Sequence, residues 1–201
     1  MGIISSKTAI RNFIPAASTD YWITADNDES IWRYKLHLGD EAYISTDDMP
    51  INLNVNPFIV IKPGDFALLL TEEELNLPSN VMAFINIRFD YKQKGLINVS
   101  GFHVDPLYVG KLIFSVFNAG SKDIVLRKRD AVFMIFFQTL DDAPATKKYP
   151  GYNCIPASMI EQIRGRSVTL ASNAHRMDRL ESYLKLLAAI VLALVGAIIA
   201  K

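Results

Sequence analysis

Residues 104–120 read VDPLYVGKLIFSVFNAG, and this stretch decides the fold. Asp105-Pro106 begins a turn, Gly110 allows the backbone to turn tightly, and an apolar run over residues 112–117 follows. Asn118-Ala119-Gly120 then marks the next turn. A short run of branched and aromatic residues between two turn signals is typical of a β-strand.

The same pattern of short apolar runs separated by turn residues extends through the chain up to about Ala143. The further runs lie at residues 58–61, 66–70, 81–87, 124–126 and 132–137. Strands of this length with turns between them predict an all-β sandwich or barrel, here a mainly β domain over residues 1–143. The run at 132–137 is apolar throughout, which predicts burial on both faces, one of them against another subunit.

The composition excludes several classes of function. The 201 residues contain 21 Lys and Arg and 21 Asp and Glu, so no charge excess favours a nucleic-acid partner, and none is predicted. Cys154 is the only cysteine and His37, His103 and His175 are scattered, so the sequence predicts neither a disulfide framework nor a metal site built by the protein. The N-terminus has no secretory signal pattern, which predicts a cytosolic folded domain.

The C-terminal part of the sequence predicts a connector and one long helix. Residues 144–162, with their Pro and Gly residues, are predicted to form a connector without a helix or strand of its own. Residues 163–184 carry a heptad pattern, which predicts a coiled-coil helix. The heptad positions are Ile163, Leu170, Met177, Leu184, Val191 and Ile198 in one series and Leu180, Leu187 and Leu194 in the other.

The end of the chain, residues 184–200, is predicted to be a membrane anchor. No charged residue lies between Leu186 and Ala200, and the lysines at 185 and 201 can reach opposite interfaces. The Lys and Arg residues before the apolar run predict a single-pass C-terminal anchor with the folded domain in the cytoplasm. The alternative is a helix buried in a soluble protein, but a helix that is apolar all round has no obvious soluble partner at this position.

A series of motifs from Ile59 to Leu140 resembles the superfamily of dUTPases and dCTP deaminases, and is closer to the deaminase branch. The matching pieces are Ile61-Lys62-Pro63-Gly64-Asp65-Phe66-Ala67-Leu68, Thr71-Glu72, Leu77-Pro78, Lys94-Gly95-Leu96, the 104–110 segment, Asn118-Ala119-Gly120 and the 132–137 strand, with Tyr34-Lys35-Leu36-His37-Leu38-Gly39 upstream. This resemblance implies a dUTPase-like distorted jelly-roll barrel that forms a homotrimer, with nucleotide sites between subunits. The coiled-coil and transmembrane helix would continue the trimer axis.

The resemblance also implies a set of site residues. Asp105 matches the aspartate that activates water, and is the candidate catalytic residue. Tyr108 matches the aromatic residue that packs against deoxyribose. The other candidate nucleotide-binding positions are Asn98, Gly101, Arg88 and Gln93. An ordinary structural role remains open as well, because Asp is favoured in turns and Tyr packs in cores.

Several catalytic motifs of the superfamily are degenerate in this sequence. Residues 89–93 replace the Ser-Ser-x-x-Arg segment that grips phosphates, and Asp90 would repel a triphosphate. The deaminase glutamate falls on Ser115, which cannot relay protons at neutral pH, and Met134 stands where many members have a Gln. Mg²⁺ is expected only as a companion of a bound nucleoside triphosphate.

These observations lead to one main hypothesis and two alternatives. The main one is a membrane-tethered, non-catalytic trimer that acts as a deoxynucleotide sensor or a docking platform. The first alternative is an active enzyme of pyrimidine deoxynucleotide metabolism, either a dUTP diphosphatase or a dCTP deaminase. The second is a trimeric tail that clusters or perturbs the bilayer when the folded domain changes state.

Overall fold

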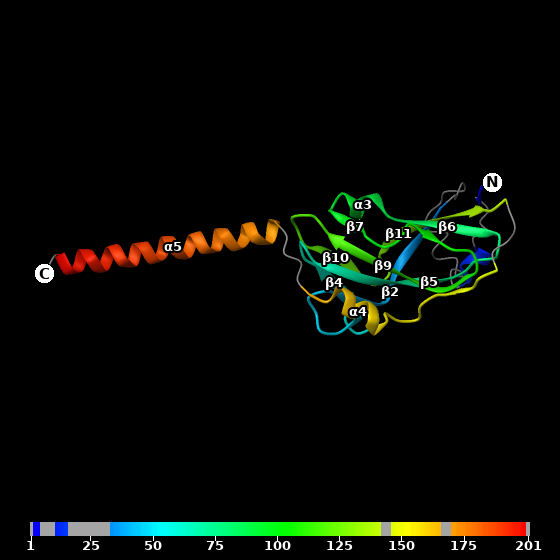
Figure 1. Cartoon of the computed structure of the whole chain (residues 1–201), viewed down its shortest axis with the longest axis horizontal. Helices are drawn as coiled ribbons and strands as arrows, with labels where there is room; N and C mark the ends of the chain where they lie inside the picture. Colours follow the sequence, from blue (N-terminus) through cyan, green and yellow to red (C-terminus); the bar gives the residue numbers. More distant parts are fainter. Residues whose placement is uncertain (1, 5–10, 16–32, 142–145, 166–169, 200–201) are drawn as a thin grey trace. The chain divides into compact units, whose positions relative to one another are not determined.

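The structure of the chain is a computed structural model that describes residues 2–4, 11–15, 33–141, 146–165 and 170–199 (Figure 1). It divides into two compact units, Met1–Arg166 and Ser167–Lys201. Several predicted positions lie outside the described residues. They are residues 1, 5–10, 16–32 and 142–143 of the β domain, 144–145 of the connector, 166–169 of the heptad helix and 200 of the anchor.

The first unit is mainly β, as predicted. Its strands are β1 (Ile3–Ile4), β2 (Tyr34–Ile44), β3 (Ile51–Asn52), β4 (Phe58–Ile61), β5 (Phe66–Asn76), β6 (Val81–Ile87), β7 (Leu96–Asn98), β8 (His103–Val104), β9 (Tyr108–Asn118), β10 (Ile124–Arg127), β11 (Ala131–Thr139) and β12 (Tyr149–Pro150). Its described part also contains the helices α3 (Phe89–Lys92) and α4 (Ala157–Ile163). The runs that the sequence marks as strands are strands here.

One large sheet carries the order β12-β9-β5-β2-β11-β6-β8, while β10 and β4 form a separate pair. The pairs are antiparallel except for β12 with β9, which is parallel. The sheet is curled, so the jelly-roll prediction is confirmed at the level of a curled antiparallel sheet (Figure 1).

The core lies between the inward faces of the curled sheet. Phe114 of β9 and Phe133 of β11 are fully buried and stack with their ring centroids 3.7 Å apart. Along β11 burial alternates, and Met134 and Phe136 remain partly exposed on the outer face. One face of β11 is therefore buried within the chain, and burial of the outer face against another subunit stays a prediction.

A buried polar cluster lies inside this core, although the sequence analysis did not predict it. Glu73 and His37 are both buried. One carboxyl oxygen of Glu73 accepts a hydrogen bond from the His37 backbone N–H at 2.9 Å, and the other contacts the His37 ring Nδ1. The Tyr34 hydroxyl donates to the same carboxyl group at 3.5 Å, and burial raises the pKa of Tyr34. Because buried polar groups must be paired, this cluster fixes β2 against β5.

The segment predicted as a featureless connector contains β12 and α4 in its described part. Ile155 is buried with Tyr43, Leu68 and Leu70, and three partly buried residues of α4 pack on this second cluster. Single apolar residues spaced between turn residues gave no clear period, so the sequence pattern did not show that this segment folds back onto the sheet.

The second unit contains α5 (Leu170–Ile199). The heptad helix begins at Leu170 rather than at residue 163, because Ile163 ends α4 and Gly165 adopts a positive φ of 138°. Large apolar side chains of α5 are exposed; they are Met177, Leu180, Tyr183, Leu184, Leu186, Leu187, Ile190, Val191 and Leu192. Among the described residues, no helix is long and apolar enough to cross a membrane. The coiled coil stays a prediction.

The buried cluster gives a first prediction. Glu73→Gln leaves one acceptor oxygen where the carboxylate offers two to the His37 N–H, the His37 ring and the Tyr34 hydroxyl, so the free energy of unfolding should fall by about 1–3 kcal/mol. Glu74→Gln is the matched control, since Glu74 is exposed on the same strand. Urea unfolding followed by tryptophan fluorescence measures both, and equal stability of the two variants would contradict the role of Glu73.

Candidate functional site

The site loop, residues 105–110, connects β8 to β9 and begins the latter strand. Asp105 is about half exposed, and its Oδ1 lies 3.8 Å from Nε2 of His103, which is also about half exposed. A solvated carboxylate of this kind can accept a hydrogen bond from water. Asp105 is therefore accessible to a ligand, as the resemblance requires of a candidate catalytic residue.

Leu107 gives the site loop a strained backbone. Its φ is 62°, in the left-handed region that a residue with a Cβ rarely adopts. That conformation costs roughly 1–2 kcal/mol for an L-residue, so the surrounding contacts must hold it. The Leu107 carbonyl accepts a hydrogen bond from Tyr149 of β12, and the neighbouring Tyr108 carbonyl accepts one from the Leu77 N–H at 2.9 Å.

Tyr108 is turned toward its own strand. Its hydroxyl donates to the Lys111 carbonyl at 2.6 Å, and its ring packs against the main core. Burial, and to a lesser extent nearby Tyr152, raises the pKa of Tyr108. The ring is half-buried, so one part packs and another part remains available to a sugar or base.

Gly110 is required by the close approach of another segment. Its φ is 133°, and a Cβ built there would lie 2.8 Å from the Gly151 Cα. A Cβ built on Gly151 would lie 2.7 Å from the Gly110 Cα. The two backbones therefore touch directly, and neither glycine can be replaced without displacing the other segment.

Asn98 and Gly101 belong to the turn between β7 and β8. The Asn98 side chain accepts hydrogen bonds from the backbone N–H of Ser100 at 3.2 Å and from its hydroxyl at 2.6 Å. Its amide donates to the Gly101 carbonyl at 3.3 Å. Gly101 is exposed, and a Cβ built there meets nothing within 4 Å. This turn is held by its own side chains.

Arg88 and Gln93 flank the short helix α3. The Arg88 guanidinium donates to the Ala131 carbonyl and to the Asp90 carboxylate, each at 2.8 Å. Gln93 is the exposed C-terminal cap of α3, and its backbone N–H donates to the Phe89 carbonyl. The one guanidinium predicted to bind phosphate is thus engaged by the aspartate that the sequence marked as repulsive.

The predicted site residues do not form one cluster within a single chain. Val104 pairs with Ala83, so Asp105 lies near the start of β6, whereas Arg88 follows its end. Six residues of extended strand separate these positions by about 20 Å. Asn98 is on β7 and pairs with Val116 of β9.

The two positions that argued against catalysis lie on strands that β5 and β2 separate in the sheet order. Ser115 is on β9, where its carbonyl accepts hydrogen bonds from Val99 at 2.9 Å and Ser100 at 3.2 Å. Met134 is on β11 and faces outward. Ser115 therefore lies directly beside the turn that carries Asn98 and Gly101.

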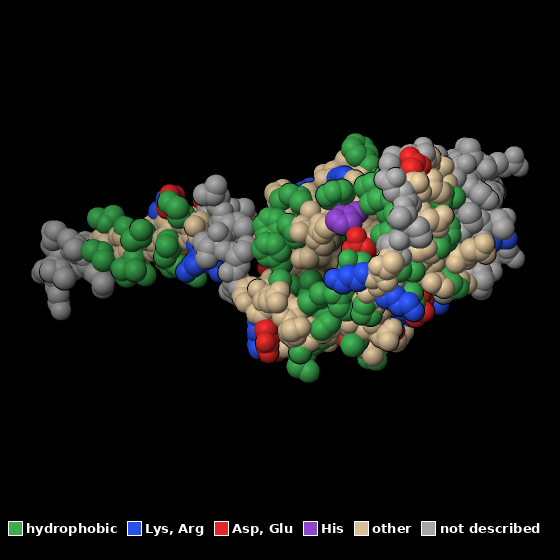
Figure 2. All heavy atoms as spheres, turned by 45° about the vertical axis from the view of Figure 1, so that its right-hand side comes forward, with side chains coloured by type: hydrophobic (Ala, Val, Ile, Leu, Met, Phe, Trp, Pro, Cys, Tyr) green, Lys and Arg blue, Asp and Glu red, His purple; other side chains and the backbone are tan. Residues whose placement is uncertain are grey.

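A row of aromatic rings crosses the outer face of the sheet. Phe84 of β6 lies with its ring centroid 5.2 Å from that of Phe136 of β11 and 6.2 Å from that of Phe102. Phe102 is 65 % exposed and lies against His103. Figure 2 shows apolar side chains gathered on one face of the β unit, beside a histidine and an acidic side chain. Phe102 is the exposed member of this row, whereas Phe84 and Phe136 are partly buried.

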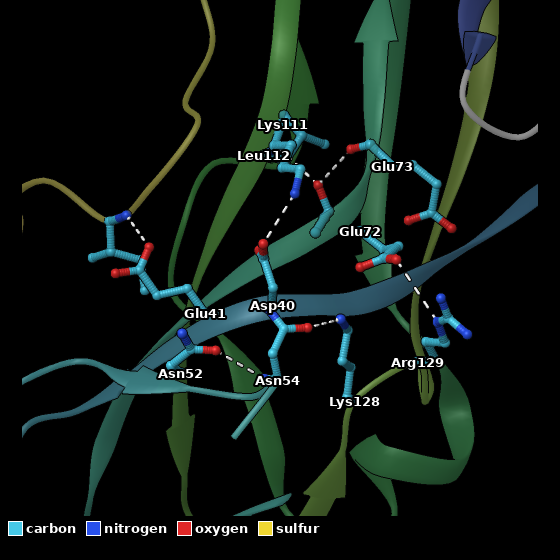
Figure 3. A network of polar contacts seen from close by, with 12 residues as sticks. Asp40, Glu41, Asn52, Asn54, Glu72, Glu73, Lys111, Leu112, Lys128 and Arg129 are labelled. Carbon is cyan, nitrogen blue, oxygen red and sulfur yellow. Dashed lines mark hydrogen bonds and ion pairs between the residues drawn. The ribbon is translucent and has the colours of Figure 1, made fainter. Parts of the chain in front are cut away.

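Sequence reasoning also missed a polar network behind the site loop (Figure 3). The Thr71 hydroxyl accepts a hydrogen bond from the Leu112 N–H and donates to the Glu73 carbonyl, both at 2.9 Å. Lys111 Nζ lies 3.4 Å from Asp40 Oδ1. The signal that could have revealed it is the polar run 71–74 inside an otherwise apolar strand. Within the described part of the chain, no three His, Cys, Asp or Glu residues gather as metal ligands.

The fold and the loop define a curled β domain with a solvent-facing aspartate at the start of a central strand. The family model described as dCTP deaminase-like matches residues 16–140, and the chain belongs to this family. This confirms the resemblance at the level of the family.

Individual proteins are similar to this chain. A dCTP deaminase of Pyrococcus abyssi is 33 % identical over 118 residues, which are 59 % of this chain and 74 % of that protein. A dCTP deaminase of Pyrococcus horikoshii is 32 % identical over 111 residues, which are 55 % of this chain and 69 % of that protein. Among solved structures, the 2′-deoxycytidine 5′-triphosphate deaminase of Agrobacterium tumefaciens matches with a TM-score of 0.46 at 17 % identity, over 53 % of this chain and 39 % of that one.

The raised pKa of Tyr108 gives a pH-dependent prediction. The folded state keeps this phenol protonated at a pH where the unfolded chain loses the proton, so its contribution is complete below about pH 10 and declines as the pH rises further. Tyr108→Phe should make the fall in stability above about pH 10 shallower. Tyr183→Phe, at an exposed position on α5, is the control. Urea unfolding between about pH 8 and pH 11 measures the slope, and an unchanged slope in Tyr108→Phe would refute the assignment.

Proposed function

We propose that the chain is a membrane-attached homotrimer of dCTP deaminase-like domains that binds a pyrimidine deoxynucleotide without converting it. The observation that carries this proposal is Ser115, which occupies the position where the resemblance requires the deaminase glutamate. A serine hydroxyl does not exchange protons near neutral pH, so it cannot serve as the acid and base for attack on a cytosine ring. A family fold that retains an exposed Asp105 and a half-buried Tyr108 supports binding without turnover.

The charge around α3 limits how the ligand's phosphates are held. Arg88 is paired with Asp90, so a triphosphate must displace the aspartate before the guanidinium can contact a phosphate oxygen. Mg²⁺ carried by the triphosphate would reduce the repulsion from Asp90. The expected affinity for triphosphates is therefore modest.

A trimer accounts for two features of the single chain. First, Phe102 is a largely exposed aromatic side chain that lies beside Phe84 and Phe136, and a second protomer can pack against it. Second, the Asp105 and Arg88 ends of β6 are about 20 Å apart, so one protomer cannot place both on one nucleotide. A site shared between protomers can, if the Asp105 end of one protomer faces the Arg88 end of the next.

The tail supports attachment to a membrane. Exposed apolar side chains follow one another along α5, including Leu186, Leu187 and Ile190, and no residue between 186 and 200 is charged. The basic residues that precede them favour a cytoplasmic position of the folded domain. In this arrangement ligand binding by the trimer would be read out at the membrane surface, or the trimer would serve as a docking platform there.

An active deoxynucleotide enzyme is the second candidate. It is favoured by the relatives named dCTP deaminase, which reach 33 % identity over most of their length. It requires that another group replaces the missing glutamate at Ser115. Hydrolysis of dUTP would in turn require phosphate contacts other than the paired Arg88.

Ligand binding can be tested by isothermal titration of the full chain in detergent with dCTP and dUTP. Binding with a dissociation constant between about 1 µM and 1 mM is expected. Asp90→Asn should tighten triphosphate binding about tenfold, because it removes the repulsion and frees Arg88. Asp123→Asn is the matched control at an exposed aspartate. No binding at millimolar nucleotide would exclude the sensor and leave the docking platform.

Membrane attachment can be tested by flotation with phospholipid vesicles. The wild-type chain should float, and the double substitution Leu187→Glu and Ile190→Glu should remain in the dense fraction, since each carboxylate is costly to bury in lipid. Ser182→Glu adds a charge to an exposed polar position of the same helix and should leave flotation unchanged. A wild-type chain that stays in the dense fraction would refute the attachment.

A further inference from the structure

A strap formed by residues 149–165 lies along the site loop. Its first part, β12, pairs in parallel with the start of β9, with Tyr149 opposite Tyr108 and Pro150 opposite Val109. Hydrogen bonds then run to alternate residues of the loop and strand. Tyr149 N–H donates to Leu107 at 3.4 Å, Gly151 N–H donates to Val109 at 2.6 Å, and Lys111 and Tyr152 exchange two bonds of 3.0 and 3.1 Å.

The backbones of the strap and the site loop are in direct contact. The Gly110 and Gly151 backbones touch, so a shift of either one moves the other. The strained Leu107 accepts its hydrogen bond from the strap, and the strain persists only while such neighbours enforce it. The conformation of the loop that carries Asp105 and Tyr108 thus depends on whether the strap is in place.

The far end of the strap is attached by modest interactions. Ile155 is its one deeply buried anchor among the described residues, and its N–H donates to Glu41 Oε2 at 2.7 Å. The helix α4 has no fully buried residue. Arg164 pairs with Asp48 at 2.5 Å through largely exposed side chains, and Gly165 N–H donates to the Ser45 carbonyl at 2.8 Å. Met159, Ile160 and Ile163 of α4 pack on the second cluster but are only partly buried. A segment with one deeply buried residue opens locally before the domain unfolds.

We propose that the strap is a latch that couples occupancy of the site loop to the segment from which α5 emerges. When the strap is docked, the loop is held in the conformation seen here, which is the one that takes the ligand. A ligand bound to the loop therefore stabilises the docked strap, and release of the strap lowers the affinity for the ligand. The two effects are equal because they express one coupling free energy. The strap ends at Gly165 and α5 begins at Leu170, so the latch acts where the chain leaves the β unit.

This inference names the regulation of the proposed nucleotide site, and so its ligand-dependent part rests on the proposed function. The dependence of the loop on the strap does not. The dependence of the loop on the strap can be measured in the chain without any nucleotide. A failure of the latch can therefore be distinguished from a failure of the proposed function.

The experiment is hydrogen–deuterium exchange of the full chain in detergent, read at two amides. The Lys111 N–H bonds to the strap, whereas the Leu77 N–H bonds to the Tyr108 carbonyl and does not touch the strap. Ile155→Ala removes the buried anchor, far along the strap from the loop. Exchange should become at least threefold faster at both amides. Ile97→Ala, at a half-exposed isoleucine on β7, is the control and should change neither.

Gly151→Ala provides a second variant that forces the strap away from Gly110, with Gly2→Ala as its control because a Cβ there meets nothing within 4 Å. At least tenfold faster exchange at both amides is expected. If the strap is released in either variant, as shown by faster exchange over residues 149–155, while Leu77 keeps its wild-type rate, the coupling is refuted.

The ligand-dependent part is read in the wild-type chain with millimolar dCTP or dUTP. Slower exchange over residues 149–155 supports the latch. Unchanged exchange there, while titration shows that the nucleotide binds, refutes the latch and leaves the proposed function intact. If neither nucleotide binds, the proposed function fails, and the two variants still decide whether the strap controls the loop.

Discussion

The domain depends on β5, which is hydrogen-bonded to β2 on one side and to β9 on the other. The pairing with β2 shifts register between Leu38 and Ala42 of β2. The pairing with β9 shifts register between Leu70 and Glu74, within the polar run 71–74 of β5. At this irregularity Thr71 and Glu73 turn inward and satisfy the backbone of the neighbouring strands. A bulge strengthens local twist and redirects side chains, and here it sets both the curl of the sheet and the start of β9 that carries the site loop.

Much of the fold could be predicted from the sequence, because short apolar runs bounded by turn residues mark each of these strands clearly. The 81–87 and 132–137 runs became β6 and β11 in full register with each other. The strap could not be predicted in the same way. Its attachment relies on a backbone contact between Gly110 and Gly151 and on one buried isoleucine, and neither leaves a periodic signal.

The sequence predicted which residues belong to the candidate site, but not how they are arranged in space. The motif order placed Asp105 and Tyr108 in one loop, and the structure keeps them there. Arg88 pairs with Asp90, which lies two residues further on at the start of α3. The sequence analysis predicted only that Asp90 would repel a triphosphate. The distance between Asp105 and Arg88 depends on how the strands pair. The order of the motifs along the sequence therefore cannot reveal it.

The chain is a dCTP deaminase-like β domain with a ligand-accessible loop, and the proposal is that it does not deaminate because Ser115 stands where the resemblance places the glutamate. The most direct test is a deamination assay of the full chain with dCTP, in which dUTP is measured by chromatography over several hours. The account predicts no dUTP above the protein-free control under conditions where dCTP binds. Formation of dUTP by the wild-type chain, and its loss in Asp105→Ala, would contradict it.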